Sequence, residues 1–324
     1  MPRKIPKIVK EIKNNPPQEI NFSYQKNISY SQMSIFRSCA YRWKLQYKDK
    51  IKRFNSSIHT VFGTAMHEVM QHYLDVGYEK SFAFADREIH MEDYFKGKFL
   101  SEYQNQYKTN NNQHFSSANE MREFYEDGVA ILNWFKKKRS RYFNKKGTYL
   151  VGCEIPIIIA PNKMYNNILY MGYLDVVTYN ENSDTFKIID IKTSTKGWNQ
   201  YDKKNEDKHF QLILYKQFFS EQYGIPLDKI DIEFFIVKRK VLDWSDENIM
   251  SPHQAYRVQT FTPPSGKIKI NRAKTAINNF ISECFNSNGN IKEIDYPKSP
   301  SKWNCTFCPY GEDKELCGAK VHFE

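Results

Sequence analysis

The chain of 324 residues lacks any uninterrupted apolar run of about 18 residues, the length that a membrane-spanning helix needs. Residues 1–20 are basic and contain no apolar stretch of the kind that a secretory signal peptide requires. Cysteine is scarce, with six in the chain, and disulfides are rare in chains without secretion signals. We therefore expect a cytoplasmic protein that makes no contact with a membrane.

Acidic residues are also in deficit: the chain has 37 Asp and Glu against 48 Lys and Arg, which gives a formal net charge of +11. Such a charge attracts polyanions and steers them toward the protein. Basic clusters that could follow a nucleic-acid backbone lie at residues 136–141, 203–204 and 238–240. The abundant aromatic side chains could stack on unpaired bases. The alternative interpretation is that the clusters are solvated surface and the aromatic residues form the core.

Two segments rich in β-branched and aromatic residues, 168–180 and 185–193, flank a run of turn-forming residues and predict a β-hairpin. Because strand side chains alternate, Asp190 and Lys192 share one face while the isoleucines beside them are buried on the other. If the loop is 181–184, Asp175 lies opposite Asp190, with Cβ atoms about 5 Å apart. A loop one residue longer would put the two aspartates on opposite faces.

Two carboxylates at that separation repel each other unless a cation lies between them, which predicts a Mg²⁺ or Mn²⁺ site. Such a metal lowers the pKa of its bound water and holds a phosphate, while the ammonium of Lys192 orients the water and stabilises developing charge. The pattern therefore predicts hydrolysis of phosphodiester bonds. The alternative is that Asp175 is a solvated hairpin residue and residues 190–192 are an ordinary strand end.

Further motifs surround this pair in a characteristic order. They are a helix ending in a cysteine at residues 30–39, a Gly-x-x-x-His motif at Gly63 and His67, an acid at Glu154, Gly172 with Asp175, Asp190 with Lys192, and a Gln-x-x-x-Tyr motif at Gln211 and Tyr215. This order resembles the PD-(D/E)XK nuclease superfamily, in particular its RecB-like exonuclease branch, whose motifs AddB-type and CRISPR-adaptation nucleases share. The resemblance implies that the metal ligands are His67, Asp175, Asp190 and the carbonyl of Ile191. It also implies that Glu154 lies near the metal, with Gln211 and Tyr215 behind the site.

Each of these residues also has a plainer interpretation. By itself, His67 fits a partly exposed histidine of an amphipathic helix. Gln211 and Tyr215 share one helix face, but the apolar residues around them indicate a helix that mainly serves the core. Glu154 could be exposed harmlessly at a strand edge, and it ranks below the two aspartates as a candidate.

Three of the cysteines form a Cys-x2-Cys-x8-Cys pattern, Cys305, Cys308 and Cys317, which predicts a metal cradle with Cys39 as the fourth ligand. The resemblance implies a [4Fe-4S] cluster, since iron-sulfur members of the branch use one early and three late cysteines. The chain departs from that pattern in its longer last spacing and in Ala40, where a proline often follows the first cysteine. Structural Zn²⁺ is the alternative, because four thiolates suit either metal centre. The other cysteines, Cys153 and Cys284, are expected in the core.

The fold that these patterns predict is α/β, a restriction-endonuclease-like mixed central sheet flanked by helices, with an N-terminal helical lobe and a C-terminal cysteine cluster. We expect a poorly ordered basic arm at 1–25 and a single nuclease domain at 26–324. Within it, the helical lobe spans about 60–145, the catalytic sheet core about 148–262 and the Cys-rich tail about 300–320. Predicted helices are 31–48, 60–78, 82–108, 117–139, 208–223 and 267–286. Predicted strands are 148–160, 168–180, 185–193, 230–239 and 255–262, and residues 194–208 are expected to form a mobile loop beside Lys192.

The resulting functional hypothesis is a divalent-metal-dependent DNA exonuclease of a bacterial or phage-infected cell. Its substrate would be DNA with a free end or a single strand, in recombination, repair or phage DNA processing, with a helicase or recombinase as a possible partner. One alternative is a catalytically idle DNA-binding or assembly subunit of a nuclease-helicase complex. Another is an RNA-processing factor whose fold is held together by structural zinc.

Overall fold

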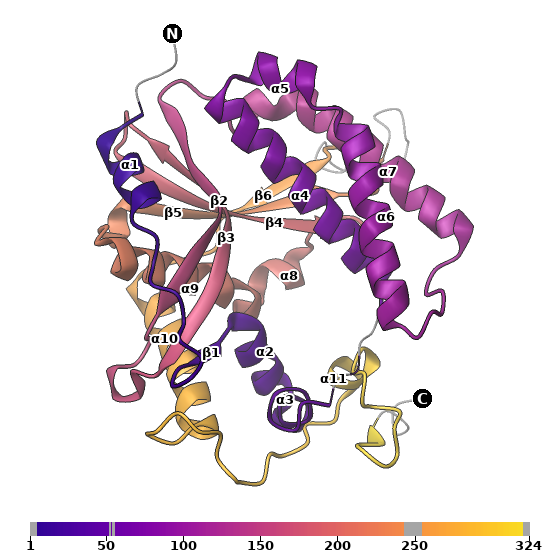
Figure 1. The fold of residues 1–324 in the computed structure, drawn as a ribbon, viewed down its shortest axis with the longest axis vertical. Helices are drawn as coiled ribbons and strands as arrows, with labels where there is room; N and C mark the ends of the chain where they lie inside the picture. The colour runs from indigo at the N-terminus through magenta and orange to yellow at the C-terminus, as the bar shows by residue number, and fades with distance from the viewer. Residues whose placement is uncertain (1–4, 52, 54–55, 243–254, 320–324) are drawn as a thin grey trace. The chain divides into compact units, whose positions relative to one another are not determined.

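The computed structural model describes residues 5–51, 53, 56–242 and 255–319 (Figure 1). Its contacts divide the chain into two compact units. Unit 1 comprises Met1–Pro16, Ser56–Pro156 and Tyr173–Ser265, and unit 2 comprises Pro17–Asn55, Ile157–Gly172 and Gly266–Glu324. In the described part of the chain, no helix has the length and apolar character needed to cross a membrane. The boundaries of the single domain expected from the sequence stay a prediction.

A mixed sheet of six strands forms the centre of the fold and has helices around it (Figure 1). Its strands are β1 (Lys26–Ile28), β2 (Thr148–Ile159), β3 (Ile168–Asn180), β4 (Thr185–Ser194), β5 (Ile230–Lys238) and β6 (Val258–Phe261). The order is β1-β3-β4-β5-β6, with β2 also paired to β3. Strand β4 is antiparallel to β3 and parallel to β5. The sequence-based prediction of a mixed central sheet is confirmed.

The β3–β4 hairpin has the register on which the predicted site depends. Val176 pairs with Ile189, and the pairing continues to Asn180 opposite Thr185. The loop is therefore residues 181–184, as expected, and Asp175 and Asp190 are the next residues beyond the last pair of the ladder.

In unit 1, four helices pack into a lobe: α4 (Ile58–Glu79), α5 (Phe82–Glu88), α6 (Met91–Thr109) and α7 (Ala118–Lys138), followed by the 3₁₀ turn η2 (Arg139–Arg141). Serine hydroxyls begin three of them, since Ser57, Ser81 and Ser117 each accept a backbone N–H of the first turn. The apolar faces of these helices share one core with Ile189 and Ile191 of β4. The isoleucines that alternate with Asp190 and Lys192 are therefore buried against this lobe, as predicted.

Unit 1 also contains α8 (Gln200–Lys204), α9 (Glu206–Tyr223), the 3₁₀ turn η4 (Leu227–Lys229) and α1 (Lys7–Asn14). Gly224 caps the C-terminal end of α9. Its φ of 66° is a left-handed conformation that glycine adopts without strain. Helix α8 lies in the segment where the sequence indicated only a mobile loop, and the Asn199–Asp202 capping box explains why a helix begins there.

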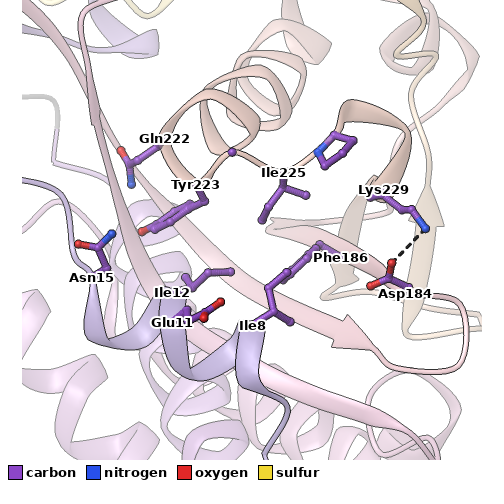
Figure 2. Close-up of a pocket in the computed structure, with 12 residues that line it drawn as sticks. Ile8, Glu11, Ile12, Asn15, Asp184, Phe186, Gln222, Tyr223, Ile225 and Lys229 are labelled. Atoms are coloured by element: carbon purple, nitrogen blue, oxygen red, sulfur yellow. Dashed lines mark hydrogen bonds and ion pairs between the residues drawn. The ribbon is translucent and has the colours of Figure 1, made fainter.

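Helix α1 corrects the expectation of an arm without regular structure, at least for residues 7–14; residues 1–4 of that arm lie outside the described part. Val9 is fully buried and Ile12 nearly so, which gives this basic segment an apolar face that holds it in place. Beside it is a cavity of about 310 Å³, into which Ile8 and Ile12 point from α1 and Phe186 and Ile225 from the opposite wall (Figure 2).

Unit 2 contains β1, the start of β3, and the helices α2 (Tyr30–Ser38), α3 (Ala40–Trp43), α10 (Lys267–Cys284) and α11 (Lys302–Thr306), with a π turn η1 (Lys44–Lys48) and a 3₁₀ turn η3 (Lys163–Tyr165). Its core is aromatic. The ring centroid of Trp43 lies 5.5–6.1 Å from those of Phe36, Phe280, Phe285 and Tyr296. The contacts with Phe36, Phe280 and Phe285 are edge-to-face, an arrangement that adds to the free energy gained by burying the rings.

Two predicted helices are divided in the structure. The helix expected at 31–48 breaks at Cys39, which has an extended backbone with φ −159° and ends α2 before α3 begins. The helix expected at 82–108 divides between α5 and α6, where Ile89 has an extended backbone. The other predicted elements lie within about three residues of the observed ones.

Candidate active site

The two aspartates of the hairpin lie at the point where the β3–β4 ladder ends. The carboxylate of Asp175 accepts the backbone N–H of Ile191 at 2.7 Å, so a side chain takes the place of the next backbone bond. Asp190 is 1% exposed. The hairpin therefore brings a second carboxylate beside a buried one, as the register predicts.

Lys192 connects this pair to helix α9. Its ammonium lies 2.8 Å from Asp190 Oδ2 and donates to Gln211 Oε1 at 3.1 Å. Gln211 Nε2 in turn donates to the hydroxyl of Tyr215 at 3.2 Å. The predicted Gln-x-x-x-Tyr pair thus forms a hydrogen-bonded chain that ends on the lysine and fixes where its charge lies.

Helix α4 brings His67 to the same place. His67 Nδ1 lies 3.6 Å from Asp175 Oδ2. Gly63, one turn earlier on the same face, explains the short approach: a Cβ at Gly63 would lie 3.2 Å from Thr193 Oγ1 of β4, tighter than an ordinary contact. The glycine of the Gly-x-x-x-His motif therefore lets α4 lie against β4 and carry the histidine to the aspartates.

Gln71, one turn after His67, was not singled out from the sequence. It is 7% exposed, and its Nε2 donates to Glu154 Oε1 at 2.6 Å and to the backbone carbonyl of Asp175 at 3.0 Å. One amide therefore connects the two acid-bearing strands β2 and β3 to the helix that carries His67. The signal was its i+4 spacing from His67, which places both side chains on one helix face.

Glu154 has a left-handed backbone, with φ of 51°, inside strand β2. A non-glycine residue in this conformation costs free energy, and such strain concentrates at functional positions. Its carboxylate is held toward Asp175 by Gln71, so the third acid predicted from the sequence does lie near the pair.

Burial and mutual repulsion determine the electrostatics of the cluster. Burial, and then the charge of Asp190, raise the pKa of Asp175 well above its usual value. Burial lowers the pKa of His67 to about 4, so its imidazole is neutral at neutral pH. Burial also acts to lower the pKa of Lys192, but Asp190 and Asp175 outweigh it and raise that pKa above its usual value. Lys192 therefore stays charged and compensates the acidic pair.

The donor set suits a hard divalent cation, because it offers carboxylate oxygens, a backbone carbonyl and a neutral imidazole. Asp190 Oδ2 is buried and receives no hydrogen bond of normal geometry in the described part of the chain. Among the described residues, however, no three His, Cys, Asp or Glu side chains converge as a metal-binding group. The carboxylates contact Lys192 and the Ile191 N–H instead, so a cation would have to displace protein contacts.

The predicted cysteine ligands gather in unit 2. Cys39, Cys305, Cys308 and Cys317 all line one cavity of about 20 Å³, together with Arg42. All four are free thiols, and they too fall short of converging as a metal-binding group among the described residues. That volume is close to what a single water-sized probe requires, so a single ion needs less rearrangement than a four-iron cluster.

Two of the basic clusters predicted to follow nucleic acid contain an arginine that forms an ion pair within unit 1. Arg239 is 8% exposed and pairs with Asp127 at 2.7 Å, which also binds Lys240 at 3.0 Å. Arg139 pairs with Asp86 at 2.7 Å. These contacts favour a structural role for the two arginines.

A comparison with protein families finds that the model of the PD-(D/E)XK nuclease superfamily matches residues 27–317. Comparison with curated proteins gives no match.

Proposed function

Because the chain belongs to the PD-(D/E)XK nuclease superfamily, whose members hydrolyse phosphodiester bonds, we propose that it is a metal-dependent DNA exonuclease that uses the Asp175, Asp190 and Lys192 cluster. The observation that carries the proposal is the register of the hairpin, which puts the two carboxylates side by side with a charged lysine 2.8 Å from Asp190. A structural strand end has no need of a buried Asp190 with a second, largely buried acid beside it and a lysine paired to it, since burying charge is costly.

In this proposal Asp175, Asp190, His67 and the carbonyl of Ile191 hold Mg²⁺ or Mn²⁺, with Glu154 nearby. A bound metal of this kind activates water and binds the phosphate. Lys192 stays protonated beside the reacting phosphate, where its ammonium stabilises developing negative charge and orients the attacking water. Gln211 and Tyr215 keep that ammonium in place through the hydrogen bonds described above.

The mode of action proposed is removal of nucleotides from DNA with a free end or a single strand. The resemblance of the motifs to RecB-like nucleases supports this choice, as does the net charge of +11. Recombination, repair or phage DNA processing is the proposed setting, in a bacterial or phage-infected cytoplasm, with a helicase or recombinase as partner.

The alternative is a DNA-binding or assembly subunit without catalysis. One observation favours it: the two acids contact Lys192 and the Ile191 N–H and, in the part of the chain that the structure describes, do not converge on a point where a metal could bind. Retention of both aspartates and the lysine argues against it, because a chain freed from catalysis has no reason to keep buried charges that cost stability.

The test is degradation of end-labelled linear DNA beside a closed circle, in Mn²⁺ or in EDTA, by the protein and by its Asp190→Ala variant. We expect metal-dependent loss of the linear DNA alone, and no loss with the variant. Survival of both DNAs while they are still bound would favour the idle subunit, and loss of both would indicate an endonuclease.

For the cysteines we propose a structural metal centre held by Cys39, Cys305, Cys308 and Cys317. The family resemblance supports a [4Fe-4S] cluster, and the small volume of the cavity that the four cysteines help to line supports Zn²⁺ as the alternative. In either form the centre ties together two ends of unit 2 that are far apart in sequence.

A further inference from the structure

We infer that helix α8 is the surface that binds the unpaired DNA strand, with Tyr201 stacking on a base and Lys204, on the same helix face, contacting a flanking phosphate. The inference rests on the proposed function and deepens it, because it assigns single-stranded DNA to a named part of the chain. The alternative role for the segment is a simple connection between β4 and α9.

The segment that carries α8 is held beside Lys192 at both of its ends. It leaves β4 at Ser194, two residues after Lys192, and enters α9, whose Gln211 accepts a hydrogen bond from the same lysine at 3.1 Å. The segment is therefore joined at both ends to elements that carry residues of the candidate active site.

The base of the segment is anchored on the sheet. The ring of Trp198 lies 4.7 Å from that of Phe234, the strand partner of Asp190. Gln259 Oε1 accepts the backbone N–H of Trp198 at 2.7 Å, and Gln259 Nε2 donates to the backbone carbonyl of Trp198 at 3.1 Å. Gly197 has φ of 93°, and a Cβ there would lie 2.9 Å from the Lys238 side chain, so the chain crosses at a point where only glycine fits. Helix α8 is thus presented from a fixed base.

Tyr201 and Lys204 are three residues apart, so they share one face of α8, and that face has the chemistry needed to hold a single strand. Tyr201 is 86% exposed, so its aromatic ring contributes little to the stability of the fold and is available to a ligand. Lys203 is half-buried and Lys204 exposed, and in the described part of the chain neither forms an ion pair. Aromatic rings beside basic side chains are how proteins hold single strands without reading their sequence.

The acids of the segment do not cancel this charge. Asp202 completes the capping box of α8 and pairs with Lys208 at 2.5 Å. Glu206 and Asp207 lie in the first turn of α9, where negative charge complements the helix dipole. Lys204 therefore remains to contact a phosphate.

The test is binding of a fluorescent single-stranded oligonucleotide in EDTA, where no cleavage occurs, at several salt concentrations. We expect Tyr201→Ala to weaken binding by about tenfold or more, the size of a lost base–aromatic stack, and Tyr201→Phe to keep the wild-type affinity. Lys204→Ala should reduce the dependence of affinity on salt.

The matched control is Lys146→Ala, which removes an exposed lysine near the hairpin loop, where Asn182 donates to the carbonyl of Lys146. This control should leave the salt dependence closer to that of the wild type. Equal affinities of wild type and Tyr201→Ala would overturn the inference. Weakened binding by the α8 variants, in a protein that cleaves no DNA, would support the inference and contradict the proposed catalysis. A wild type that binds no DNA would contradict both.

Discussion

Asp175 and Asp190 bring two carboxylates together in a buried part of the sheet, and this arrangement costs stability unless positive charge compensates it. Lys192 supplies one such charge. Natural proteins commonly retain destabilising groups where activity requires them. Removing one charge of the acidic pair is therefore expected to raise the stability of the protein while it lowers activity.

The first prediction concerns Asp175→Asn. Asparagine can still accept the Ile191 N–H but carries no charge, so the melting temperature in EDTA should rise by a few degrees. The gain should be largest at alkaline pH, because the folded state penalises the ionised acid, and should shrink as the pH falls through the raised pKa of Asp175. Thermal unfolding in EDTA and in Mn²⁺ measures this. Mn²⁺ should stabilise the wild type more than the variant, and equal metal effects would contradict the assignment.

The second prediction concerns Gln71→Leu, which removes the amide that holds Glu154 and the Asp175 carbonyl. We expect the Mn²⁺ concentration for half-maximal stabilisation to rise by about tenfold or more, as when a group that orients metal ligands is lost. The matched control is Gln217→Leu, since Gln217 is about as buried and also donates to a glutamate at 2.6 Å, but this glutamate, Glu221, lies on its own helix α9. Equal metal responses of the two variants would show that Gln71 is merely structural.

At this scale the sequence predicted the strand register and the positions of both aspartates and Lys192, because alternation along strands is regular. It did not predict Gln71, whose role depends on how closely α4 approaches two strands. Nor did it predict the left-handed backbone of Glu154, because no residue type announces such strain.

At the scale of elements, the approach of α4 to β4 positions the histidine, and Gly63 is the residue that permits it. Element boundaries followed the sequence where apolar periodicity and serine caps agree, as in α4 and α7. They departed from it where an extended residue divides a periodic run, as at Cys39. Helix α1 was missed because the lysines within it and the prolines on either side of it concealed a short apolar face.

The third prediction compares two helix glycines. Gly63→Ala should reduce cleavage while changing stability little, because its Cβ presses on Thr193 Oγ1 at 3.2 Å and moves α4 with His67. Gly97→Ala, which has open space in α6, should stabilise the protein by about 0.5–1 kcal/mol and leave activity unchanged. Adding Thr193→Ala to Gly63→Ala should restore activity. A Gly63→Ala variant with wild-type activity would contradict the close-approach argument.

At the scale of the whole molecule, the candidate catalytic residues belong to unit 1 and the four cysteines to unit 2. The sequence predicted which residues gather in each group from motif order, but not this division. The division depends on contacts between segments far apart in the chain, such as the aromatic core around Trp43. Sequence spacing alone carries no information on such contacts.

The fourth prediction follows from that division. Cys308→Ala should lose the bound iron or zinc and lower the temperature at which unit 2 unfolds, since a structural metal contributes folding free energy. Elemental analysis and thermal unfolding of the purified protein measure both effects. Cys284→Ala is the control, because this buried cysteine lies outside the group of four and should keep the metal. A Cys308→Ala protein with full metal content and stability would contradict the structural centre.

The most direct measurement of the central claim is single-turnover cleavage of a labelled oligonucleotide in saturating Mn²⁺ by the wild type, Lys192→Ala and Lys187→Ala. Lys187 lies on the same strand and pairs with Glu233 at 3.5 Å, so its loss controls for removing a strand lysine. The account predicts that Lys192→Ala lowers the rate by about a hundredfold or more while DNA remains bound, and that Lys187→Ala cleaves as the wild type does. Wild-type cleavage by Lys192→Ala would contradict the assignment of the site.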